Sequence, residues 1–364
     1  MGGGRWNVLV LGAALGLAPL AARAQLNFDL IYDPSMDPRA LAGFQMAAQR
    51  WSSAFRDPVT ISLEIGFNVL PEDILGGTGS LRGTVPYDIF KSALDFDRSS
   101  IFDDIAVSSL QPGSTFAMLL NRTANSPHGA GSATPFLDAD GDTNNTLVSM
   151  TLANARALGL FYAEGVEVDA GIEFNSLFDF DFDPTDGIDA DKIDFVGVAA
   201  HEIGHALGFV SGVDILDQNS PPLGGPFNDN IFRYVSPLDF FRFSRESVAV
   251  GQGVFDWTAD AREKYFSIDG GYTSFGPFAT GLAFGDGDQA SHWKDNLGLG
   301  LLDPTGAYGE PLNLTVRDLV AMDVIGWNIA IPAAVPEPST YGFLGASALF
   351  AGVLLRRRRL NRVD

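Results

Sequence analysis

The segment His201-Glu202-Ile203-Gly204-His205 combines two imidazoles and a carboxylate in the pattern H-E-x-x-H. If this segment is helical, His201 and His205 lie one turn apart on the same face, with Cβ atoms about 5–6 Å apart. Two imidazoles at that spacing can bind a single Zn²⁺, and Glu202 remains free to act as a general base toward a zinc-activated water. The pattern therefore predicts a hydrolytic metal site with His201 and His205 as ligands and Glu202 as the base.

The flanking residues favour a helix at this position. Asp194 has a side chain suited to an N-cap, and the residues from Phe195 to Ala200 are all apolar or small. Gly208 follows the motif at the point where a helix would have to turn away. The alternative is a helix whose histidines are only hydrogen bonded to carboxylates or to the backbone, and this alternative gives Glu202 no role.

A catalytic zinc needs a third protein ligand. The chain contains four histidines, namely His128, His201, His205 and His292. The compact spacing H-E-x-x-H-x-x-G-x-x-H is followed as far as Gly208, but Ser211 occupies the position of the third histidine. The third ligand is therefore His292 or the loop residue His128, or else the site has lost its activity. Glu246 and Glu263 lack the N-E-x-x-S-D context that a glutamate ligand would need.

His292 lies in the segment Ser291-His292-Trp293, which is followed by a short turn at 300–304. Together with the H-E-I-G-H-A-L-G-F segment at 201–209, these features resemble the leishmanolysin-like branch of the metzincin zinc peptidases. In that branch an insertion separates the helix from the third histidine, and a turn containing methionine lies beneath the metal. The resemblance implies a zinc endopeptidase that acts on a polypeptide substrate, with these metal ligands and base: His201, His205, His292 and Glu202.

The methionine that this resemblance implies is replaced by Leu302. That side chain does not ligate zinc, so we interpret Leu302 as a packing substitution. Met322 is an alternative turn methionine, but its spacing with Leu319 and Ile325 is typical of the core face of a helix.

Two acidic loops suggest calcium sites, because carboxylate oxygens at every second position can surround a hard cation. Neither loop has the spacing of an EF-hand, and solvated acidic turns are the alternative. The candidate calcium ligands are Asp138, Asp140, Asp142, Asp181, Asp183 and Asp186.

The elements that would position these residues can be read from hydrophobic periodicity and from capping residues. We expect helices at 37–55 and 147–158, strands at 59–67 and 170–175, and a last helix that opens at Thr315 and closes at Gly326. The fold class that follows is α+β, with a zincin-like twisted mixed sheet and the active-site helix in the N-terminal part. A less regular C-terminal subdomain completes the catalytic domain, residues 25–331.

Both ends of the chain have the composition of targeting segments. Residues 1–24 combine an apolar run with the small-residue pattern Ala22-Arg23-Ala24, which predicts a signal peptide that signal peptidase removes. Near the other end, Pro336-Glu337-Pro338 precedes an apolar stretch at 341–355 and a run of four arginines, Arg356–Arg359. This order resembles the PEP-CTERM sorting signal of Gram-negative bacteria, whereas a simple membrane anchor is the alternative.

The PEP-CTERM resemblance implies handling by an exosortase and transient membrane association through the short apolar segment of the tail, residues 332–364. It also implies delivery to the cell envelope, the cell surface or the surroundings of the cell. The formal net charge of −22 makes nucleic acid a poor partner, and the absence of cysteine excludes disulfides and thiolate ligands. The sequence thus predicts an exported zinc endopeptidase; the alternative is a surface or matrix binding protein built on an inactive zincin scaffold.

Overall fold

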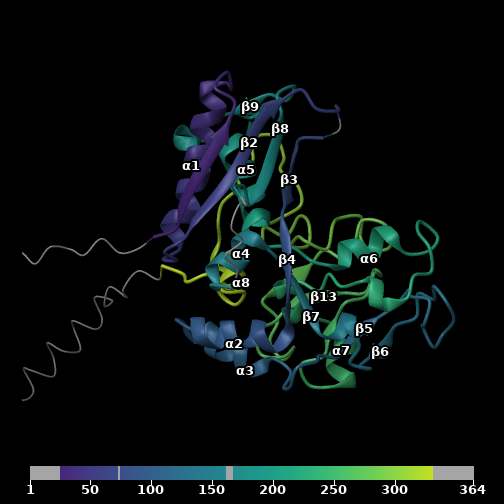
Figure 1. Ribbon diagram of the computed structural model, residues 1–364. Helices are drawn as coiled ribbons and strands as arrows, with labels where there is room; N and C mark the ends of the chain where they lie inside the picture. Colours follow the sequence, from purple (N-terminus) through teal and green to yellow (C-terminus); the bar gives the residue numbers. More distant parts are fainter. Residues whose placement is uncertain (1–24, 73, 161–166, 331–364) are drawn as a thin grey trace, which may run out of the picture.

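The computed structural model describes residues 25–72, 74–160 and 167–330 (Figure 1). The expected signal peptide and the expected sorting tail, with its apolar stretch at 341–355, lie outside the described residues. Among the helices of the described part, none has both the length and the apolar character needed to cross a membrane.

The largest sheet has four strands, in the order β1-β2-β8-β3. Their bounds are β1 (Asn27–Tyr32), β2 (Thr60–Asn68), β8 (Ala170–Asn175) and β3 (Gly76–Ser80). The first three strands are parallel, whereas β3 pairs antiparallel with β8 and forms one edge of the sheet. The short, glycine-rich strand β3 is in direct contact with the helix that carries the histidine motif. The edge of the mixed sheet therefore lies beside that motif.

Two helices, α1 (Pro38–Ala54) and α5 (Phe195–Leu207), pack against each other and against this sheet (Figure 1). Phe44 of α1, Phe174 of β8 and Phe195 of α5 form a fully buried cluster, with ring centroids 5.0–5.2 Å apart. Trp51 of α1 also donates an indole hydrogen bond to the carbonyl of Ala200, at 2.8 Å. Burial of these large rings fixes α5 relative to the sheet.

The remaining elements are short, and Figure 1 shows α2, α3, α7 and most of the small sheets in the lower part of the view. The other helices are α2 (Tyr87–Asp97), α3 (Ile101–Ser109), α4 (Leu152–Ala157), α6 (Val213–Asn219), α7 (Arg245–Val250) and α8 (Val316–Asp323). The 3₁₀ turns are η1 (Thr143–Asn145), η2 (Pro184–Asp186), η3 (Asp229–Ile231) and η4 (Pro237–Phe241).

The other strands form four small sheets. Two of these are pairs, β4 (Arg82–Pro86) with β7 (Leu147–Thr151), and β9 (Phe180–Asp181) with β10 (Ile193–Asp194). The two others are three-stranded. One has the order β12 (Phe255–Asp256), β5 (Met118–Leu120), β6 (Phe136–Asp138), and the other has the order β11 (Arg242–Phe243), β13 (Lys264–Phe266), β14 (Gly276–Phe278).

The α+β class is confirmed, and so are the expected first helix, both expected strands and the last helix, whose N-cap Thr315 forms a capping box with Asp318. The helix expected at 147–158 is wrong in its first half. Residues Leu147–Thr151 form β7, which pairs antiparallel with β4, and only Leu152–Ala157 is helical. The β-branched Val148 and Thr151 suit a strand, and Thr151 then caps the short helix by accepting from Asn154 N at 3.2 Å.

Candidate metal centre and active site

Three histidine side chains meet at one point, although His292 is distant in sequence from the other two. The Nε2 atoms of His201 and His205 are 3.0 Å apart, those of His205 and His292 are 3.1 Å apart, and those of His201 and His292 are 3.2 Å apart. Tetrahedral Zn–N bonds of about 2.0–2.1 Å place two ligand nitrogens about 3.3–3.4 Å apart. The observed triangle is therefore close to the size that a tetrahedral metal ion requires.

The second nitrogen of each ring fixes the tautomer. Each Nδ1 lies within hydrogen-bond distance of a backbone carbonyl, with the pairs His201–Leu301 at 2.9 Å, His205–Phe209 at 2.7 Å and His292–Gln289 at 3.2 Å. A carbonyl oxygen only accepts, so each Nδ1 carries the hydrogen and each Nε2 presents a lone pair. This is the arrangement in which neutral histidines bind metals.

The surroundings keep two of these rings neutral. Burial, together with the neighbouring His201, lowers the pKa of His205 to about 3. Burial and the two other histidines also lower the pKa of His292 well below its ordinary value. Three lone pairs that face one another at about 3 Å repel unless a cation lies between them. The donor set thus fits a nitrogen-preferring metal ion.

Local sequence explains how α5 presents its two histidines. Asp194 caps the helix by accepting from Gly197 N at 2.8 Å, as the sequence predicts. At the other end Gly208 has a φ of 122°, a left-handed conformation that favours glycine. The chain therefore turns back at once, and the carbonyl of Phe209 reaches the imidazole of His205.

A hydrogen-bonded loop brings His292 to this helix. The carboxylate of Asp214, in α6, accepts from the backbone amides of Ala290 at 2.6 Å and Ser291 at 3.2 Å, and also from the Ser291 hydroxyl. Burial raises the pKa of Asp214 to about 6, and these same hydrogen bonds oppose that rise. Ser291 in turn accepts from Ser211 N at 2.8 Å. The segment that carries His292 is thus fastened to the chain directly after α5.

The turn at 300–304 lies against the same helix. Leu302 is fully buried, and a Cβ added to Gly204 would lie 3.0 Å from a methyl carbon of Leu302. The buried carboxylate of Asp318 accepts from Leu301 N at 2.9 Å and from the indole of Trp293 at 2.8 Å, so it links this turn to the residue after His292. Met322 is buried in α8, as expected for a core residue.

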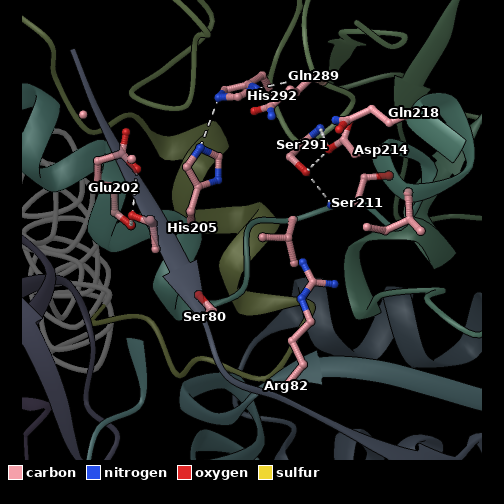
Figure 2. A pocket seen from close by; sticks show the side chains of 15 residues that line it. Ser80, Arg82, Glu202, His205, Ser211, Asp214, Gln218, Gln289, Ser291 and His292 are labelled. Carbon is pink, nitrogen blue, oxygen red and sulfur yellow. Dashed lines mark hydrogen bonds between the residues drawn. The ribbon is translucent and has the colours of Figure 1, made fainter. Parts of the chain in front are cut away.

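Glu202 lies beside the histidines in an open cleft of about 400 Å³. Its carboxylate accepts a hydrogen bond of 2.7 Å from the hydroxyl of Thr78, in β3. Figure 2 shows Glu202 on one side of His205, with Asp214 and Ser291 near His292 and with Arg82 farther along the cleft. The arrangement places a carboxylate, the imidazoles of His205 and His292 and one positively charged side chain, Arg82, around the same cavity.

The sequence reasoning did not identify the contributions of Thr78, Arg82 and Asp214. Thr78 belongs to Gly76–Ser80, whose composition gives no strand signal, and Asp214 acts only through the fold. The alternative ligand His128 is exposed and lies outside the histidine group. Glu246 and Glu263 are also absent from the clusters that the described residues form around a possible ion.

The two expected calcium loops differ in the structure. Asp138 and Asp140 of the first loop lie close to Asp229, which the sequence reasoning did not include. In the second loop Asp181 accepts from the backbone amides of Asp183 at 3.0 Å and Asp189 at 2.9 Å, which is a hydrogen-bonded turn. The described part of the chain does not bring Asp181, Asp183 and Asp186 together as ligands, so the prediction of calcium there is not supported.

Comparison with known proteins identifies the C-terminal segment. Residues 334–359 match the family model of the PEP-CTERM protein-sorting motif, a range that includes Pro336, Glu337 and Pro338. The sorting signal is thereby confirmed, and it indicates export, processing by an exosortase and sorting to the cell envelope. No curated protein and no solved structure matches the chain.

Proposed function

We propose that this exported protein is a zinc-dependent endopeptidase of the leishmanolysin-like metzincin type. The observation that carries the proposal is the triangle of Nε2 atoms, 3.0–3.2 Å apart, beside the carboxylate of Glu202 in an open cleft. Three ligands leave a fourth position for water or substrate, which distinguishes catalytic zinc sites from closed structural sites. In support, a mixed sheet with an antiparallel edge strand stands beside the helix that carries the motif.

The donor set favours zinc among the common metals. All three donors are imidazole nitrogens, and neither a thiolate nor a carboxylate belongs to this group of ligands. Imidazole suits zinc, copper, iron and nickel, whereas calcium and magnesium prefer oxygen. Among the four metals that imidazole suits, zinc combines tetrahedral geometry with hydrolytic rather than redox chemistry.

In the proposed mechanism Glu202 moves the proton. Zinc, when bound by the three histidines, supplies a Lewis acid that polarises the scissile carbonyl and lowers the pKa of a water. Thr78 holds one oxygen of the Glu202 carboxylate at 2.7 Å and leaves the other oxygen available. Glu202 accepts a proton from the attacking water and then passes it to the nitrogen of the departing amine.

The edge strand favours a polypeptide substrate. Among the described residues β3 pairs with β8 alone, and Gly76, Gly77 and Thr78 line the cleft. A Cβ added at Gly77 or Gly79 would meet no other atom within 4 Å, so the face of this edge strand on which the two glycines lie is open. An extended peptide can pair with such an edge through its backbone, which would place a peptide bond beside Glu202.

The alternative function is a non-catalytic surface or matrix binding protein on the same scaffold. The two functions differ in the use of Glu202, because binding alone has no need for a general base beside the histidines. Retention of Glu202 and of all three histidines in one cluster favours catalysis.

The test is hydrolysis of unfolded casein by the zinc-loaded full chain, with Glu202→Gln and the exposed Glu263→Gln prepared in parallel. We expect Glu202→Gln to bind zinc normally but to lose at least about 100-fold in cleavage rate, since general-base catalysis contributes about 10²–10⁴-fold. Glu263→Gln should cleave like the wild type. If the zinc-loaded wild type does not cleave casein, the binding function is the better explanation.

A further inference from the structure

A second cluster of charged side chains lies away from the histidine site, where three short elements meet. Asp138 ends β6, Asp140 lies in the loop that follows, and Asp229 begins η3. One carboxylate oxygen from each of the three residues lies within 4.8 Å of the corresponding oxygens of the other two. Asp138 is 3% exposed and Asp229 is fully buried, so most of this charge is removed from water.

Nothing in the described protein neutralises these charges. No lysine or arginine in the described residues forms an ion pair with Asp138, Asp140 or Asp229. Burial first, and then the neighbouring carboxylates, raise the pKa of Asp138 to about 7, although a hydrogen bond from Asn144 opposes the rise. Buried carboxylates without a counter-charge are costly unless they are protonated or bind a cation.

An unpartnered oxygen at the same place independently indicates a ligand. Asn144 is fully buried, and its amide nitrogen donates to Asp138 at 2.8 Å, whereas its Oδ1 has no hydrogen-bond partner. The orphan oxygen belongs to the same planar amide group whose nitrogen contacts Asp138, so an exchange of the two amide atoms would turn this oxygen toward that carboxylate. Oδ1 of Asp142 is a second buried oxygen in this loop without a partner.

We propose that this cluster is a calcium site, with Asp138, Asp140 and Asp229 as its carboxylate ligands and Asn144 and Asp142 as further oxygen donors. Ca²⁺ takes about 6–8 oxygen ligands from carboxylates, amide carbonyls and water, in a flexible geometry. A rotation of the Asn144 amide by a half turn places its oxygen where its nitrogen now meets Asp138, and the cation then lies between the two oxygens. All the donors of this site are oxygen atoms, so its metal preference differs from that of the histidine centre, whose donors are nitrogen atoms.

The site joins two parts of the chain that are far apart in sequence. Thr143 N, in η1, donates to the side chain of Asn230 at 2.8 Å, and the side chain of Asn125 contacts Asp229. The η3 turn belongs to the long insertion between Ser211 and His292. Calcium at this position would therefore fasten the insertion to the loop after β6, in a protein whose exported location gives access to extracellular calcium.

The test is a Ca²⁺ titration of the chelator-treated, purified full chain, followed by isothermal calorimetry and by thermal unfolding. We expect one Ca²⁺ per chain and a rise in Tm of about 4 °C at 100 times the Kd. His205→Ala should show the same rise, because the histidine centre is not involved. The exposed Asp186→Asn, in the other acidic loop, is the matched control and should also behave like the wild type.

Two substitutions decide the assignment. Asp138→Asn should abolish the rise in Tm. Asp140→Asn should weaken Ca²⁺ binding by at least about 10-fold. This second variant should stay folded, because Asp140 is exposed and an asparagine there can still accept from Asp142 N. The proposal is overturned if Ca²⁺ neither binds nor raises the Tm of the wild type. It is equally overturned if Asp140→Asn binds Ca²⁺ as tightly as Asp186→Asn does.

Discussion

The backbone amide of Ser211 donates a hydrogen bond of 2.8 Å to the hydroxyl of Ser291. Ser211 occupies the position at which the compact H-E-x-x-H-x-x-G-x-x-H spacing would have its third histidine, and Ser291 directly precedes His292. The long insertion therefore begins after Ser211 and ends at Ser291, and the hydrogen bond between these two residues holds its two ends together. His292 thereby reaches the two helical histidines without a contiguous motif.

This relationship predicts which histidine binds the metal with His201 and His205. His292→Ala should lose bound zinc as fully as His201→Ala does, because each removes one of the three converging Nε2 atoms. His128→Ala should retain one zinc per chain, since His128 is exposed and lies outside the cluster. Zinc content of the purified variants, measured by mass spectrometry, checks this; the opposite pattern would refute the ligand assignment.

Thr78 is expected to position the base. Thr78→Val removes the hydroxyl that donates to Glu202 but keeps the shape of the side chain. We expect kcat for casein cleavage to fall about 10- to 100-fold while KM and zinc content remain close to those of the wild type, because one hydrogen bond to a charged group contributes about 1.5–3 kcal/mol. Thr78→Ser retains the donor and should restore most of kcat. Equal rates for Thr78→Val and Thr78→Ser would contradict this role.

Leu302 is expected to act through packing alone. Leu302→Met conserves volume beneath α5 and should change the free energy of unfolding by less than about 1.5 kcal/mol, with cleavage within about twofold of the wild type. Leu302→Ala should cost about 2–5 kcal/mol because it leaves a cavity in a fully buried position. Chemical denaturation and casein cleavage check both variants. A large gain in activity for Leu302→Met would instead mean that a methionine is needed here.

The carboxylates near α8 predict a dependence of stability on pH. Burial, followed by the charge of Asp103, raises the pKa of Asp323 to about 7, and burial likewise raises the pKa of Asp97 to about 7. Burial also raises the pKa of Asp57 and of Asp103 in the same cluster. At these four carboxyl groups the folded protein therefore holds more protons than the unfolded chain between about pH 4 and pH 7, so their contribution to the free energy of unfolding falls as the pH rises through this range.

Substitution of Asp323 tests whether the contribution of these carboxyl groups to stability falls as the pH rises. Asp323→Asn cannot ionise and can still accept from the hydroxyl of Ser100. We expect its Tm to exceed that of the wild type at pH 8 and to differ little from it at pH 4.5, where Asp323 is protonated in the folded wild type. Thermal unfolding at the two pH values measures the difference. A Tm for Asp323→Asn that is higher by the same amount at both values would contradict the titration.

The sequence predicted best what is encoded over short distances. The two helical histidines and Glu202 lie within one turn of helix, and Asp194 and Gly208 bound that helix by capping rules that act locally. His292 could be inferred because the chain has only four histidines and because the segment Ser291-His292-Trp293 resembles the distant third-ligand segment of leishmanolysin-like metzincins. Local periodicity misassigned Leu147–Thr151, because its pairing with Arg82–Pro86 is a long-range interaction.

Contacts between distant segments were beyond the sequence reasoning. Gly76–Ser80 has no side-chain pattern typical of a strand, yet its Thr78 contacts Glu202. Asp229 lies far along the chain from Asp138 and joins it only through the fold, whereas Asp181 and Asp183 have a similar spacing but form a hydrogen-bonded turn. Carboxylate spacing alone therefore did not distinguish a cluster from a solvated loop.

The most direct test of the zinc peptidase proposal is a titration of metal-free full chain with Zn²⁺, in the presence of excess Ca²⁺, with bound zinc and casein cleavage measured in the same samples. We predict that cleavage rises with zinc and reaches its maximum at one equivalent per chain, as the single triangle of Nε2 atoms requires. Saturation at one equivalent of zinc without any cleavage would contradict the proposed function and would leave a zinc-binding surface protein as the explanation.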